Sequence, residues 1–169
     1  MSNQLISDLP LYTGNTIGSY LVINDSGETT TYKTTLETLL LNNTPPQFNQ
    51  MVTFWNTYVS QPYAVNGNGI IYYIVSPGTF GNNPKYSSII QATYTGKFMN
   101  NVTFDSSPSP AFFQMNSVIQ SWQIILQLIK PGGRILFASP SQYCYGVDGG
   151  GSIPPNAPLY FDVTLSSVS

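Results

Sequence analysis

The chain is 169 residues long, and only 7% of its residues are charged, with a formal net charge of −2 and no histidine, whereas an average globular domain has about 25% charged residues. The five basic residues form no cluster, which disfavours nucleic-acid binding. Because histidine is absent and Cys144 is the single cysteine, serine–histidine triads, cysteine proteases, zinc sites and an internal disulfide are excluded, and we expect no cofactor and no metal.

The first 44 residues are predicted to form a small separate segment. Residues 19–24 and 29–33 have the pattern of two strands joined by a turn, and Thr34 with Glu37 forms a capping box that predicts a short helix. Residues 1–10 have neither a basic region nor an apolar stretch, and no run of about 18 apolar residues occurs in the sequence. We therefore expect neither a signal peptide nor membrane insertion.

Two stretches of this segment resemble N-terminal modules of tailed-phage virion proteins. They are ISDLP at residues 6–10 and YLVINDSGETTTYK at residues 20–33. The resemblance implies that residues 1–44 attach a distal domain to a phage particle, so that the protein is made in the bacterial cytoplasm and located in the virion. It also implies virion proteins as partners and a homo-oligomer, for which we expect a trimer.

Residues 45–66 are predicted to form an amphipathic helix followed by a linker. Thr44 is a suitable cap, Pro45 fits the first helical position, and the apolar residues recur at intervals of three and four. These residues are Phe48, Met51, Val52, Trp55, Tyr58 and Val59. The stripe has two interpretations at this stage: it packs on the neighbouring domain, or it packs on further copies of the chain.

Residues 67–169 have the pattern of an α+β domain. Strands are predicted at residues 70–75, 87–94, 134–138 and 159–165, and the one clear helix is predicted at residues 118–129, before Pro131 and two glycines. We therefore predict an antiparallel sheet wrapped on one helix.

Several short motifs of this domain resemble the FKBP-type peptidyl-prolyl isomerases in order and spacing. They are YTG at 94–96, FDSS at 104–107, VI at 118–119 with Trp122, YG at 145–146, IPP at 153–155 and LYFDVTL at 159–165. The resemblance implies a half-open apolar cup that binds a proline side chain. It implies catalytic positions at Tyr94, Asp105, Tyr145 and the backbone N–H of Ile153, and substrate-binding positions at Phe104, Val118, Ile119, Trp122 and Phe161.

These residue types suit the chemistry of proline isomerisation. Rotation about an X-Pro bond has a barrier of roughly 18–20 kcal/mol because the amide loses its resonance. A catalyst needs a dry pocket for the ring and fixed dipoles that favour the twisted amide, and it needs no covalent step.

The sequence departs from the family at several positions around the cup, including Gln120, where the family often has a basic residue or proline. Ser121 occupies a position that is usually glycine, and Ala111 occupies one that is aromatic in some members, so one wall of the cup is expected to be lower. Taken singly, the site residues also have ordinary interpretations. Phe161 has the alternation of a core strand residue, Trp122 lies on an apolar helix face, and Asp105 precedes two serines as a turn residue would.

Two functions of different classes remain at this stage. In the first, the domain is an isomerase that acts on proline-containing peptides or proteins while attached to a phage virion. In the second, it is a catalytically silent head that binds a peptide or a host-surface molecule, or that decorates the particle.

Overall fold

The computed structural model describes residues 22–23, 29–30 and 46–169, and the chain divides into two compact units, 1–43 and 44–169. In the first unit, β1 (Val22–Ile23) pairs antiparallel with β2 (Thr29–Thr30). The helix predicted from the capping box at Thr34 lies outside the described residues. Within those ranges, no helix combines the length and the apolar character needed to cross a membrane.

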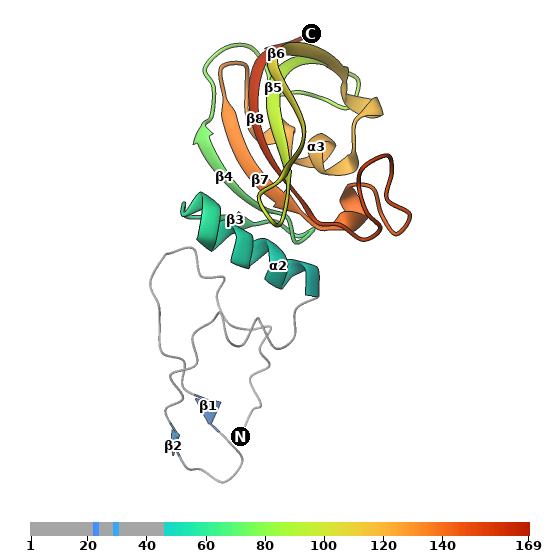
Figure 1. Cartoon of the computed structure of the whole chain (residues 1–169). Helices are drawn as coiled ribbons and strands as arrows, with labels where there is room; N and C mark the ends of the chain where they lie inside the picture. The colour runs from blue at the N-terminus through green and yellow to red at the C-terminus, as the bar shows by residue number, and fades with distance from the viewer. Residues whose placement is uncertain (1–21, 24–28, 31–45) are drawn as a thin grey trace. The chain divides into compact units, whose positions relative to one another are not determined.

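The second unit contains a six-stranded sheet in which every neighbouring pair is antiparallel (Figure 1). The strand order is β3-β4-β7-β8-β5-β6. The bounds are β3 Ala64–Val65, β4 Ile71–Ser76, β5 Ile89–Phe98, β6 Thr103–Gln114, β7 Arg134–Ser139 and β8 Leu159–Val168. The α+β prediction is confirmed.

Two short helices pack on opposite faces of this sheet, α2 (Pro46–Phe54) and α3 (Gln120–Ile125). The strand residues show this by their alternation. Ile135 and Phe137 of β7 belong to the core that contains Trp122 of α3, whereas Leu136 belongs to the core that contains Met51 of α2. The central strand β7 is therefore buried on both faces.

The α3 helix is shorter than the predicted 118–129. Val118 and Ile119 precede it with extended ψ angles of 165° and 150°, and a 3₁₀ turn, Leu126–Leu128, follows it. The apolar spacing continues through this turn, which explains why the sequence pattern overestimates the helix.

The apolar stripe of residues 45–66 packs on the sheet. Met51, Phe54 and Trp55 are buried against a cluster that includes Leu136 and Tyr160. Phe54 was not in the predicted stripe, and Tyr58, which was, is 52% exposed. Phe54 lies three residues after Met51 on the same helix face, and its ring contacts that of Tyr58 at 5.1 Å, at the start of the π-helical turn Trp55–Val59.

The segment predicted as a linker contains β3, which pairs with β4. The turn between them is held by Asn66, whose Oδ1 accepts hydrogen bonds from the N–H groups of Asn68 and Ile70, both at 3.0 Å. This hairpin joins the end of the α2 segment to the sheet.

The sequence pattern does not predict strand β6, because Pro108 and Pro110 lie within it. The strand lies at the edge of the sheet, where a missing N–H is tolerated. Its register with β5 shifts, so that Ala92 pairs with Ala111 and Tyr94 pairs with Ser107. The two prolines occupy the resulting bulge.

Candidate functional site

A cluster of aromatic rings surrounds Trp122 of α3. Its ring meets Tyr94 at 5.2 Å and 83°, Phe113 at 5.4 Å and 64°, and Phe161 at 5.8 Å and 90° between centroids and planes. Edge-on contacts of this kind are favoured by the ring quadrupoles. Trp122 is only 4% exposed, so the rings form a nearly dry floor.

Phe104 extends the cluster from strand β6. Its ring meets Phe161 at 5.8 Å and 90° and Phe98 at 5.1 Å. Gly96 makes room for it, since a Cβ at this glycine would lie 2.6 Å from the Phe104 ring. The glycine of the YTG motif is therefore a packing requirement of the cluster.

The indole Nε1 of Trp122 has no hydrogen-bond partner, and it is the only such buried side-chain nitrogen or oxygen among the described residues. An unpaired buried donor costs about 1–3 kcal/mol. The perpendicular rings around the indole compensate only weakly, through N–H···π contacts at most. The unpaired donor is a cost of filling this face with rings.

The polar edge of the cluster is formed by Tyr94 and Asp105. The Tyr94 hydroxyl donates a 2.5 Å hydrogen bond to Oδ2 of Asp105. Burial raises the pKa of Tyr94 well above its usual range, and the bond to Asp105 and the carboxylate charge raise it further. Tyr94 is therefore protonated and a donor at neutral pH.

Tyr145 lies in the loop between β7 and β8 and is 41% exposed. Burial raises its pKa, and the nearby Cys144 and Asp105 add to the shift. The Tyr145 hydroxyl is therefore neutral at pH 7, and its pKa depends in part on the charge of Asp105.

The backbone N–H of Ile153 is already paired. It donates to the carbonyl of Gly150 at 2.9 Å, and the Gly150 N–H donates back to the Ile153 carbonyl at 3.0 Å. The Ile153 side chain is 7% exposed and belongs to the core. A substrate carbonyl could use the Ile153 N–H only if the loop released this bond.

A second backbone donor, which the sequence pattern does not indicate, lies at the start of α3. The N–H of Ile119 precedes the first turn of α3, and its carbonyl accepts the Trp122 N–H at 3.0 Å. The first N–H groups of a helix lack intrahelical partners. The predicted start of this helix was the sequence feature that could have indicated the Ile119 N–H as a donor.

The remaining predicted positions are apolar walls or packing residues. Val118 and Ile119 are half-buried against the Trp122 core. Ser121 is fully buried, and its Oγ lies 3.7 Å from Sγ of Cys144. Burial raises the pKa of the Cys144 thiol, and hydrogen bonds with Ser121 and Ser139 partly oppose this shift. Ser121 is thus accommodated by packing against Cys144.

Two cavities lie apart from Trp122. One, of about 390 Å³, runs along α2. The other, of about 250 Å³, lies beside the Arg134–Asp162 ion pair and is lined in part by Tyr94. Trp122 lines neither. The concentration of rings, the unpaired donor and the Tyr94–Asp105 pair nevertheless favour the cluster as the site.

No group of three metal-ligating side chains is found in the part of the chain that the structure describes.

Comparison with known proteins agrees with this geometry. The family model described as FKBP-type peptidyl-prolyl cis-trans isomerase matches residues 81–166, half of the chain. The chain belongs to the FKBP family. Every motif of this site, from Tyr94 to Phe161, lies inside the FKBP match.

Curated relatives match the FKBP part and are longer than this chain. A probable FKBP-type peptidyl-prolyl cis-trans isomerase of Haemophilus influenzae is 42% identical over 106 residues, covering 60% of this chain and 44% of that protein. The macrophage infectivity potentiator of Trypanosoma cruzi is 36% identical over 120 residues, covering 68% and 61%. The chain thus spans less than two thirds of the length of these relatives.

Solved structures share the FKBP fold. The crystal structure of FkpA from Escherichia coli has a TM-score of 0.66 and 28% identity, covering 79% of this chain and 64% of that one. A peptidyl-prolyl cis-trans isomerase from Pseudomonas syringae has a TM-score of 0.62 and 29% identity, covering 75% and 98%.

The structure brings most of the predicted site residues together. Tyr94, Phe104, Trp122 and Phe161 form one ring cluster, and Asp105 closes its polar edge. Tyr145 lies close enough to Asp105 to be affected by its charge, and Ile153 contributes its side chain to the same core. Their catalytic and substrate-binding roles stay predictions.

Proposed function

We propose that this domain is a peptidyl-prolyl cis–trans isomerase that binds its substrate proline on the Trp122 ring cluster. The observation that supports it most directly is the Tyr94–Asp105 hydrogen bond at the edge of a buried aromatic floor, within the residues that match the FKBP family.

The ring cluster would act on the amide by providing an apolar environment. A planar amide is stabilised by charge separation between oxygen and nitrogen, and this stabilisation is lost when the bond is twisted. A dry site on Trp122 and Phe104 therefore disfavours the planar form relative to the twisted one. Binding energy from the proline ring would offset the loss of hydration.

Polar groups at the edge would hold the twisted carbonyl. The neutral hydroxyl of Tyr145 and the N–H of Ile119 are the donors available near the cluster, while the Ile153 N–H is engaged by Gly150. Asp105 would keep Tyr94 in place by accepting its hydroxyl proton in a hydrogen bond. Donors that are fixed before the substrate arrives need no reorganisation during rotation.

The test is NMR exchange between the cis and trans forms of a short apolar X-Pro peptide, with and without a catalytic amount of the full chain. Acceleration that falls in Tyr145→Phe and Asp105→Ala, both folded by circular dichroism, supports the proposal. If the folded parent chain gives no acceleration, the isomerase proposal is wrong. Peptide-induced shifts around Trp122 would then favour the alternative, a catalytically silent binding or decorative head.

We also propose that residues 1–44 display this domain on a phage virion, with virion proteins as partners and a trimeric assembly. The support is the resemblance of residues 6–10 and 20–33 to virion attachment modules. Mass spectrometry of gradient-purified particles should find the chain in fixed stoichiometry with the tail or head-fibre proteins. Its absence from purified particles, or a monomeric mass by light scattering, would contradict the respective part of the proposal.

A further inference from the structure

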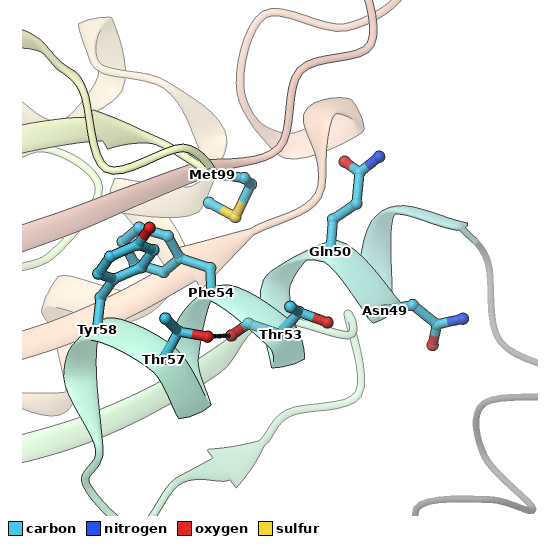
Figure 2. Close-up of a pocket in the computed structure, with 7 residues that line it drawn as sticks. All are labelled: Asn49, Gln50, Thr53, Phe54, Thr57, Tyr58 and Met99. Carbon is cyan, nitrogen blue, oxygen red and sulfur yellow. Dashed lines mark hydrogen bonds between the residues drawn. The ribbon is translucent and has the colours of Figure 1, made fainter.

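A groove along the solvent side of α2 lies apart from the ring cluster (Figure 2). Its volume is about 390 Å³, within the usual range of small-molecule sites, about 300–1,000 Å³. All but one of its lining residues come from the helical segment 49–58, and Met99 from the turn between β5 and β6 closes it. None of them contributes to the site at Trp122.

One end of the groove is aromatic. Phe54 is buried beneath it, and its ring meets Tyr58 at 5.1 Å, while Tyr58 is 52% exposed. Figure 2 shows these two rings beside Met99. An exposed ring on a buried apolar support suits a ligand with a face of C–H groups, because aromatic rings have a negative face.

The rest of the groove is polar and uncharged. Gln50 presents a primary amide with donors and an acceptor, and Thr53 and Thr57 present hydroxyls. The Thr57 hydroxyl donates to the Thr53 carbonyl at 2.7 Å, which leaves its oxygen to accept a further bond. Groups that both donate and accept are suited to ligand hydroxyls, which do the same.

No charged side chain lines this groove, and the sequence has no charged residue between Glu37 and Lys85. A charged ligand would therefore lose hydration without gaining an ionic partner. The helical stretch from Asn49 to Tyr58, which spans the end of α2 and the π-helical turn, extends about 13 Å along its axis, which suits an elongated ligand. These properties together select a neutral, polyhydroxylated and elongated molecule.

We propose that the α2 groove binds a short neutral saccharide, with one sugar ring packed on Tyr58 and neighbouring hydroxyls bonded to Gln50 and the threonines. This site is separate from the proposed isomerase site and does not depend on its activity.

The test is a titration of the ¹⁵N-labelled full chain with maltotriose, cellotriose and triacetylchitotriose, followed by amide shifts. At least one sugar should give saturable shifts at Gln50, Thr53 and Tyr58. Tyr58→Ala and, separately, Gln50→Ala should weaken that binding tenfold or more. The matched control is Tyr86→Ala, since Tyr86 is 62% exposed and lies outside the groove. It should bind as the parent does.

Three results would overturn the proposal. The first is no saturable shift with any of the three sugars. The second is parental affinity in both Tyr58→Ala and Gln50→Ala. The third is the appearance of the same shifts when protein concentration is raised without sugar, which would assign the groove to contacts between copies of the chain.

Discussion

The hydroxyl of Tyr94 donates a hydrogen bond of 2.5 Å to the carboxylate of Asp105. The two residues lie on neighbouring strands, where Tyr94 pairs with Ser107 and Gly96 pairs with Asp105, so they are diagonal neighbours across β5 and β6. This contact joins the aromatic floor to the polar edge of the proposed isomerase site.

We expect Asp105→Asn to lower isomerase activity about tenfold or more while the fold is kept, because a neutral amide replaces the carboxylate in the charge-assisted hydrogen bond that holds Tyr94. The measurement is the cis–trans exchange rate by NMR. Ser106→Ala, an exposed neighbour, is the control and should keep the parental rate. An unchanged rate in Asp105→Asn would show that the carboxylate has no part in turnover.

We expect Trp122→Ala to destabilise the domain by about 3–5 kcal/mol and to abolish proline-peptide binding, because it removes a ring that is 4% exposed. Urea denaturation measures the first effect. Phe112→Ala is the control, since that ring is 73% exposed and should change stability by about 0.5 kcal/mol or less. Trp122→Phe keeps a ring in place, and peptide binding as tight as that of the parent would argue against a specific need for the indole.

We expect Gly96→Ala to destabilise the domain by about 1–3 kcal/mol and to weaken peptide binding, because the new methyl group would lie 2.6 Å from the Phe104 ring and force it to move. Gly67→Ala is the matched control, since its Cβ would meet nothing within 4 Å. Thermal unfolding should give a lower melting temperature for Gly96→Ala than for Gly67→Ala. Equal melting temperatures would mean that the Phe104 ring moves aside without a loss of stability.

We expect stability to fall at alkaline pH. Burial raises the pKa of Tyr94, so the folded chain keeps a proton that the unfolded chain, with an ordinary pKa of 10.0, loses. The contribution to stability is thus complete below about pH 10 and is lost as the pH rises further. Urea titrations at pH 8, 10 and 11 measure it.

In Tyr94→Phe the alkaline loss should be smaller, with a remainder from Tyr160, whose pKa is also raised by burial. An identical pH dependence in the variant and the parent would show that Tyr94 ionises alike in both states. The isomerase rate of the parent should not fall between pH 7 and 9, since Tyr94 and Tyr145 both have raised pKa values.

The domain class, the family motifs and much of the core could be predicted from the residues alone. The alternation in residues 159–165 places Leu159, Phe161, Val163 and Leu165 on one face, and the structure buries them in one core. Such predictions succeed because periodicity reports which face of a strand avoids water.

The elements that cover each face of the sheet, and the polar groups that meet there, could be identified only in the folded chain. The π-helical turn Trp55–Val59 follows α2, and the bulge at Pro108 and Pro110 sets the register that brings the Tyr94 hydroxyl to Asp105. The engagement of the Ile153 N–H by Gly150 also depends on the folded loop. Some of these contacts join segments that are distant in the chain, and others depend on local backbone angles. They could not be predicted because a pattern of residue types specifies neither the strand register nor the backbone angles.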